Sequence, residues 1–178
     1  VQGACVRHEI DVTAKKEVRA EAYVKKLRTY MIELKFHHAP GIYTGLKETL
    51  YTYARFLDLK EGFKKGLCEK FDQPWLVCNT KFSGDAIKYA NCKNLRLIGW
   101  AYPTGDSLET MIDSKKLYPI TAIRGLDRKT AKSLIDANII LCKDLIKMKI
   151  DTLQKKTGLS KIKLEQLVKK AVDLCNQN

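Results

Sequence analysis

The pattern of apolar residues changes near residue 103, and this change limits the folds that the chain can adopt. Before it, short apolar runs indicate strands, and apolar positions at helical spacing indicate helices. After Pro103-Thr104-Gly105-Asp106 only helical patterns follow. Strands are expected over residues 3–14, 29–38, 74–79 and 95–100, and helices over residues 44–59 and 83–92.

The order strand, strand, helix, strand, helix, strand predicts an α/β fold with a mixed β-sheet flanked by helices. The first two strands form an antiparallel hairpin, and crossover connections then bring the later strands in parallel. Thr44 is the expected cap of the first helix. We therefore expect an α/β domain over residues 1–103, a linker over residues 104–118 and a small all-α domain over residues 119–178.

Acidic residues stand in the first two expected strands. Asp11 ends His-Glu-Ile-Asp within residues 8–12, and Glu33 begins Glu-Leu-Lys within residues 31–36. Side chains alternate along a strand, so Glu33 and Lys35 point to the same face, and pairing as a hairpin puts Asp11 beside Glu33. Two carboxylates and a lysine at one sheet edge suit a metal-dependent phosphodiesterase, in which carboxylate oxygens hold a hard cation such as Mg²⁺. Alternation alone also produces this pattern in strands that have no catalytic role.

The charge of the chain favours an anionic partner. It has 178 residues with 33 Lys and Arg against 20 Asp and Glu, a net charge of +13. Nucleic acid or an anionic membrane surface are the partners that such a balance indicates, and a lysine-rich solvated surface is the alternative. No apolar run reaches the roughly 20 residues that span a bilayer, so we expect no membrane segment. No secretory signal stands at the N-terminus. The chain opens directly on an expected strand, and we expect a fragment of a longer protein.

The six cysteines do not suggest a metal site or a disulfide framework. None forms a Cys-x-x-Cys pair, and Cys78 and Cys142 lie in apolar stretches. Buried reduced thiols in a cytoplasmic protein are the interpretation that fits this distribution.

Residues 119–178 contain two similar units. Each has a short helix, a Gly-Leu turn at Gly125 or Gly158, an expected helix cap at Asp127 or Ser160, and a longer helix. A bridging helix over residues 139–146 joins them. The sequence therefore predicts two helical hairpins.

The N-terminal part resembles the restriction-endonuclease-fold nucleases of the PD-(D/E)xK superfamily, and most of all the branch related to Mrr-type restriction enzymes. The resemblance covers residues 1–103 and is carried by residues 8–12, 32–37, 50–56, 77–83 and 97–100. It implies a restriction-endonuclease-like sheet. By position it also implies that Asp11, Glu33 and the backbone carbonyl of Leu34 hold Mg²⁺ or Mn²⁺, and that Lys35 is the catalytic lysine.

Two departures from the superfamily pattern stand out. The helix that usually precedes the first strand, and adds another acid, is missing here. Mrr-type relatives often carry a glutamine in the helix after the Glu-x-Lys strand, where this chain has Lys47-Glu48 and Tyr51. In similar proteins the nuclease unit follows a nucleotide-binding ATP-cone domain, so the resemblance implies such a domain upstream in the full-length chain.

Two further residues are candidates for DNA contact. His37 falls on the face of Glu33 and Lys35 by parity, although a solvent-facing histidine at the strand end fits as well. Lys81 stands at a strand-to-helix turn, where backbone amides can hold an anion and plain capping is the alternative.

The C-terminal part resembles a tandem helix-hairpin-helix module, as found in small domains of DNA repair proteins. Such hairpins bind phosphates without reading base sequence. The resemblance implies DNA contacts from Arg124, Gly125, Arg128, Lys129, Gly158, Lys161 and Lys163. The usual hairpin has a second glycine two residues after the first, and this chain has Asp127 and Ser160 there.

Together these observations predict a Mg²⁺-dependent endonuclease that acts on double-stranded DNA, working as a homodimer because double-strand cutting needs two active sites. Two alternatives stay open. One is a DNA-binding module that has lost catalysis, and the other is a protein-interaction adaptor that binds its partner through the helical tail.

Overall fold

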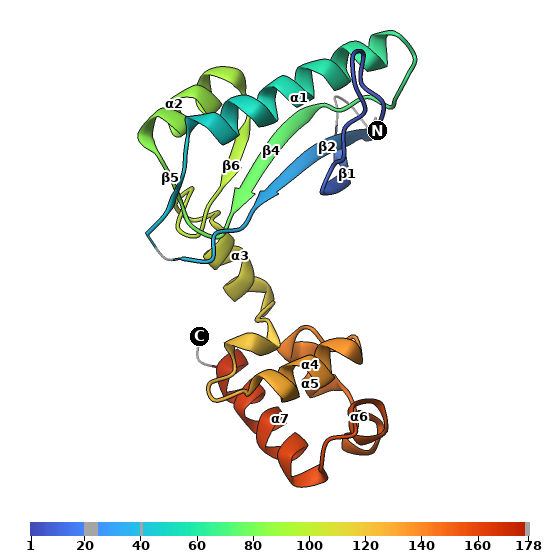
Figure 1. Cartoon of the computed structure of the whole chain (residues 1–178), viewed down its shortest axis with the longest axis vertical. Helices are drawn as coiled ribbons and strands as arrows, with labels where there is room; N and C mark the ends of the chain where they lie inside the picture. Colours follow the sequence, from blue (N-terminus) through green and yellow to red (C-terminus); the bar gives the residue numbers. More distant parts are fainter. Residues whose placement is uncertain (20–24, 40, 177–178) are drawn as a thin grey trace. The chain divides into compact units, whose positions relative to one another are not determined.

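The chain forms two compact units, Val1–Leu108 and Glu109–Asn178, which are described separately (Figure 1). The structure is a computed structural model that describes residues 1–19, 25–39 and 41–176. The first unit contains a mixed β-sheet with helices, and the described part of the second contains helices alone. The mixed α/β architecture expected from the sequence is confirmed.

The elements alternate in the first unit as the apolar pattern indicates. They are β1 (Val12–Arg19), β2 (Lys25–Lys35), β3 (Tyr43–Thr44), α1 (Leu46–Lys64), β4 (Gln73–Cys78), β5 (Lys81–Phe82), α2 (Gly84–Lys93) and β6 (Arg96–Ile98). Helix α3 (Leu108–Lys115) begins on the last residue of this unit. After it come the 3₁₀ helix η1 (Ile120–Ala122), α4 (Arg128–Asp136), α5 (Cys142–Lys147), α6 (Ile150–Thr157) and α7 (Lys161–Asn176). None of the helices in the described part of the chain is both long and apolar enough to cross a membrane.

The main sheet has the strand order β1-β2-β4-β6, with β1 antiparallel to β2 and the other neighbours parallel. Helices α1 and α2 make the two crossovers and lie over the same side of this sheet (Figure 1). Parallel strands require such crossovers, because a short turn can join only antiparallel neighbours. The short strands β3 and β5 form a separate parallel pair beyond the ends of β2 and β4.

Alternation along the strands decides which side the helices cover. In β4 the buried residues are Pro74, Leu76 and Cys78, and Leu76 packs in one apolar cluster with Ala86 of α2. On β2, Met31 packs with Phe56 and Leu59 of α1. Glu33 is two residues beyond Met31, so it points to the same helix-covered side.

Three expectations about the first unit need correction. The strand expected over residues 3–14 begins only at Val12, because the residues before it form a loop on α1. Thr44 does not cap α1: it is buried in β3, and Gly45 is the cap residue, with its N–H donating to Glu48 Oε2 at 3.0 Å. The expected linker over residues 104–118 contains a helix, α3.

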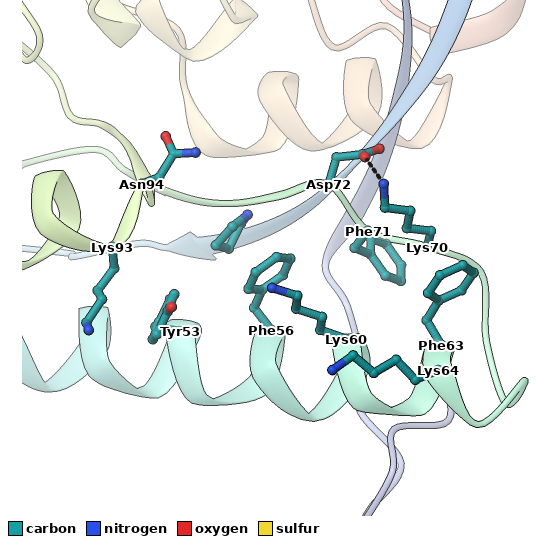
Figure 2. Close-up of a pocket in the computed structure, with 11 residues that line it drawn as sticks. Tyr53, Phe56, Lys60, Phe63, Lys64, Lys70, Phe71, Asp72, Lys93 and Asn94 are labelled. Atoms are coloured by element: carbon teal, nitrogen blue, oxygen red, sulfur yellow. Dashed lines mark ion pairs between the residues drawn. The ribbon is translucent and has the colours of Figure 1, made fainter.

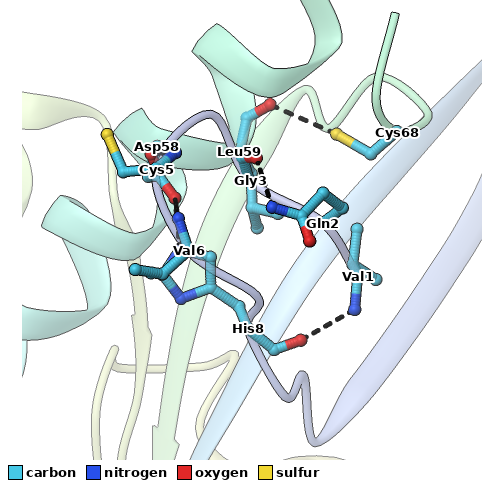
Figure 3. Close-up of polar contacts among 9 residues, drawn as sticks. All are labelled: Val1, Gln2, Gly3, Cys5, Val6, His8, Asp58, Leu59 and Cys68. Atoms are coloured by element: carbon cyan, nitrogen blue, oxygen red, sulfur yellow. Dashed lines mark hydrogen bonds and ion pairs between the residues drawn. The ribbon is translucent and has the colours of Figure 1, made fainter.

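The N-terminal loop is held on α1 by Asp58 (Figure 3). Asp58 accepts hydrogen bonds from the backbone N–H of Cys5 at 2.8 Å and contacts His8 Nε2 at 2.7 Å. Gly3 permits this approach, since a Cβ there would lie 2.0 Å from the Asp58 carboxylate. Burial raises the pKa of Asp58, but hydrogen bonds from His8 and from the Cys5 backbone outweigh it and lower the pKa to about 2. The same carboxylate raises the pKa of the Cys5 thiol, so this Cys-His-Asp group does not contain an activated nucleophile.

Candidate functional site

The end of β2 gathers the acidic residues and the lysine that the sequence singled out. Val12 pairs with Ile32, and one further step in this register puts Asp11 opposite Glu33. Asp11 Oδ2 accepts a hydrogen bond from the Leu34 backbone N–H at 2.8 Å. The Asp11 carboxylate therefore lies against the peptide that joins Glu33 to Leu34.

The Glu33 carboxylate is buried and has two cationic partners. The side chain is 5% exposed, and Lys35 Nζ donates to its Oε1 at 3.0 Å. Arg55 Nη1 contacts its Oε2. Both oxygens of this acid are thus engaged, one from the same strand and one from helix α1.

Arg55 is the residue that sequence reasoning missed. It is 8% exposed, and its guanidinium carbon lies 5.4 Å from the centre of the Tyr51 ring. Its Nε is buried and has no hydrogen-bond partner among the described residues. Its position in the sequence could have indicated this role. Arg55 lies on the same helix face as the buried Thr52 and Leu59, and a buried arginine needs an acidic partner.

The donor set at this edge suits Mg²⁺ in chemical type. Mg²⁺ is commonly held by one or two carboxylates, with waters and substrate phosphates completing its coordination. Asp11, Glu33 and the Leu34 carbonyl supply hard oxygen atoms of that kind. No cluster of three or more His, Cys, Asp or Glu residues with metal-site geometry occurs in the described ranges. A cation bound through Glu33 therefore has to compete with Lys35 and Arg55 for the same oxygens.

The residues next to this edge are built into the local structure. The His37 backbone N–H donates to Asn79 Oδ1 at 2.8 Å, and His37 Nε2 lies 3.0 Å from Thr44 Oγ1. His37 lies two residues beyond the end of β2, so strand parity does not set its direction. Lys81 is exposed in β5.

The second unit contains the two Gly-Leu turns at corresponding places. Gly125 and Gly158 have φ of +75° and +68°, a conformation that side chains with a Cβ rarely adopt. The residue two positions later faces the start of the next helix in both cases. Asp127 accepts from the Thr130 N–H at 2.9 Å, and Ser160 Oγ from the Lys163 N–H at 3.4 Å. Ten buried residues around Leu134, Leu145 and Leu164 form the core that joins the two turns.

The basic residues of the two turns differ in their partners. Arg128, Lys129 and Lys161 are exposed at the starts of α4 and α7. Lys163 donates to Asp127 Oδ2 at 3.0 Å, which links the second turn to the first. Hydrogen bonds from the Thr130 hydroxyl and backbone N–H, and from Lys163, hold the pKa of Asp127 well below its usual range.

Lys170 adds a cation that sequence reasoning did not place at the first turn. Its Nζ donates to the Arg124 carbonyl at 3.0 Å and lies near Gly125. A hollow of about 290 Å³ lies beside this contact and is lined by Arg124, Lys170 and Asp173.

Comparison with known proteins decides the family. The chain is 43% identical over 171 residues to an uncharacterized protein of Archaeoglobus fulgidus, a match that covers 96% of this chain and 87% of that protein. The crystal structure of AF1548, a protein of unknown function, matches 100% of this chain with 86% of its own length, at 41% identity and with a TM-score of 0.72. The chain belongs to the AF1548-like family. The family model for the AF1548-like C-terminal region matches residues 118–175, so the two Gly-Leu turns lie within that region.

Proposed function

We propose that this AF1548-like chain is a Mg²⁺- or Mn²⁺-dependent DNA endonuclease with a restriction-endonuclease-like first unit. The observation that carries the proposal is the grouping of Asp11, Glu33 and Lys35 at the end of one hairpin. The Asp11 carboxylate contacts the Leu34 N–H, and the Lys35 ammonium contacts Glu33. The order of these residues is that of the PD-(D/E)xK superfamily and its Mrr-like branch.

The proposed roles follow from the chemistry of each group. Asp11, Glu33 and the Leu34 carbonyl would hold the cation, which when bound would stabilise charge on the scissile phosphate. Lys35 orients the attacking water and helps to remove its proton. Arg55 holds the Glu33 carboxylate in place from α1, which makes it a positioning residue.

The second unit is proposed as a tandem helix-hairpin-helix module that binds the phosphates of double-stranded DNA. The left-handed turns at Gly125 and Gly158 and the exposed Arg128, Lys129 and Lys161 support this role. We also propose a homodimer, which double-strand cleavage requires, and an ATP-cone domain upstream in the full-length chain. A cytoplasmic location is proposed as well. It agrees with the six cysteines, which are free within the described structure.

One observation favours a second candidate, a DNA-binding module without catalysis. Both Glu33 oxygens are engaged by cationic side chains of this chain, and Arg55 is nearly buried. A carboxylate that is neutralised internally is a poorer ligand for a cation, because each of its contacts must be given up or shared.

Plasmid cleavage with Mg²⁺, with Mn²⁺ and with a chelator tests the proposal. The wild-type chain is expected to nick supercoiled DNA only with the metal. The Lys35→Ala variant is expected to lower the nicking rate by about 100-fold or more, the size of a lost general acid or base. Lys35 is the preferred position because its side chain is a third exposed and its removal leaves Glu33 paired with Arg55.

Lys88→Ala is the matched control, since Lys88 is exposed on α2 and far more solvated than Lys35. Thermal unfolding of all variants checks that the fold is kept. Nicking by Lys35→Ala at the wild-type rate overturns the proposed site. Salt-sensitive DNA binding without nicking by any protein, with either metal, supports the second candidate.

A further inference from the structure

A hollow in the first unit has no role in the proposed hydrolysis. It has a volume of about 450 Å³ and lies between the C-terminal half of α1, the chain entering β4 and the end of α2 (Figure 2). Pockets for small ligands commonly have volumes of about 300–1,000 Å³. The size of this hollow therefore suits a ligand as large as a nucleotide.

Aromatic side chains form one part of its lining. Phe56 and Phe71 are 8% and 3% exposed and close the floor, while Phe63 is 43% exposed at the edge. Tyr53 lines the hollow beside Phe56, with ring centres 6.2 Å apart. Phe63 has the exposed ring of this lining, and such a ring accepts a planar base by stacking, whichever base it is.

Lysines form the other part. Lys60 and Lys64 lie one turn apart on α1, Lys70 precedes β4, and Lys93 ends α2 with its Nζ 5.9 Å from the centre of the Tyr53 ring (Figure 2). Four cations thus surround a lining that contains a single acid, Asp72.

Asp72 is already committed to internal contacts. One of its oxygens accepts from the Thr29 N–H at 2.9 Å, and the other contacts Lys70 Nζ at 3.0 Å. Neither Lys60 nor Lys64 makes an ion pair with any residue in the described ranges. Like charges four residues apart on a helix repel each other, so α1 carries an unfavourable pair that an anion would relieve.

We propose that this hollow, called the groove below, binds a nucleotide, with the base against the exposed Phe63 ring and the phosphate between Lys60 and Lys64. The same chemistry is present in a free nucleoside phosphate and in a nucleotide of a DNA strand. This binding requires neither a metal nor cleavage, so it can be tested independently of the endonuclease proposal.

Fluorescence anisotropy in the presence of a chelator tests it, with a labelled oligothymidylate and labelled ATP as the two probes. The Lys60→Ala/Lys64→Ala variant is expected to weaken binding by about tenfold or more. For the oligonucleotide it should also reduce the slope of log affinity against log salt by about 0.7, which the loss of one neutralised phosphate gives on a single strand. Phe63→Ser should weaken binding without changing that slope, because it removes a stacking surface and no charge.

Lys16→Ala/Lys88→Ala is the control, because it removes two exposed lysines of the same unit away from the groove. It is expected to change affinity by less than about twofold. Thermal unfolding of each variant excludes loss of the fold, which is expected to be kept because Lys60, Lys64 and Phe63 are exposed.

The outcomes separate the sources of the ligand. Groove-dependent binding of ATP assigns a free nucleotide, and groove-dependent binding of the oligonucleotide alone assigns a DNA strand; both support the proposal. Equal effects of the groove and control variants overturn it. Competition by pyrophosphate or polyglutamate as strong as by ATP, together with unchanged binding by Phe63→Ser, also overturns it in favour of a simple anion surface.

Discussion

Helix α1 carries two groups of charged side chains that lie in opposite environments. Near its middle, Arg55 is buried and contacts the buried carboxylate of Glu33. Further along the helix, Lys60 and Lys64 are exposed beside a hollow and have no acidic partner among the described residues. The same helix therefore carries one cation that pairs with an acid inside the fold and two cations that have no such partner.

The difference shows how to separate structural from ligand-binding charges. Replacing both residues of a buried ion pair by apolar side chains of similar volume often leaves stability unchanged. Removing one of them destabilises the fold strongly, because the other charge stays buried and unpaired. An exposed charge beside a like charge adds nothing to stability, which leaves it free for the binding role proposed above. In these proposals Glu33 serves both the fold and the chemistry, whereas Lys60 and Lys64 serve binding alone.

The largest expected effect comes from breaking the buried pair. Arg55→Ala should lower the free energy of unfolding by about 3–5 kcal/mol, because it leaves Glu33 buried with Lys35 as its sole described partner. Urea unfolding followed by circular dichroism measures this change. The Glu33→Leu/Arg55→Leu variant is the control, and it should recover most of the loss by replacing both charges with apolar side chains. If Arg55→Ala lowers the free energy of unfolding by less than about 1 kcal/mol, the pair contributes no more than an exposed surface ion pair does.

The second effect concerns Asp58, an acid on α1 that holds the N-terminal loop. Its pKa of about 2 in the folded protein lies below the ordinary value of 3.8, so its contribution is complete at neutral pH and is lost as pH falls from about 4 to about 2. The unfolding temperature of the wild type should fall more steeply across that range than that of Asp58→Asn. Asp85→Asn, at an exposed site on α2, should keep the wild-type pH dependence. Parallel curves for wild type and Asp58→Asn would contradict the assigned role of Asp58.

A smaller effect with the opposite sign is expected in the groove. Lys60→Glu places an acid four residues before Lys64, the favoured orientation on a helix, and should raise the free energy of unfolding by about 0.5 kcal/mol. The same change should abolish binding of the nucleotide probes. Urea unfolding and anisotropy on one preparation measure both. A decrease in stability would mean that Lys60 contributes to the fold, as Arg55 does.

The smallest expected effect is a change in the first Gly-Leu turn. Asp127→Ser gives the first turn the serine that the second turn has at the same position, and serine still caps the helix. The change also removes the 3.0 Å contact between Lys163 and Asp127. DNA affinity at low salt should rise modestly, because an anion leaves a turn that is proposed to bind phosphate. Ser160→Asp is the matched reverse change and should lower the affinity. Equal binding by both variants would argue for a structural or protein-binding tail.

Local sequence signals were sufficient for β4, for the start of α2 and for the two Gly-Leu turns, but not for every element. The apolar alternation of residues 74–78 predicts β4, and Ser83 stands where the next helix was expected to start. Gly125 and Gly158 were expected in Gly-Leu turns before a helix cap, and the structure adds that both have a positive φ. The boundary of β1 was missed because the residues before Val12 have strand-like composition but are fixed by Asp58, about 50 residues away in the chain.

The sequence by itself determined the mixed sheet, the helical second unit and the grouping of Glu33 with Lys35. These features depend on periodicity and backbone preference, which neighbouring residues encode. The tertiary structure alone decided that Arg55 meets Glu33 across 22 residues, that Asp127 meets Lys163 across 36, and that three separate elements enclose a lysine-rimmed groove. Such contacts depend on which faces packing brings together, and one helix can bury a charge and expose another without any local sign of the difference.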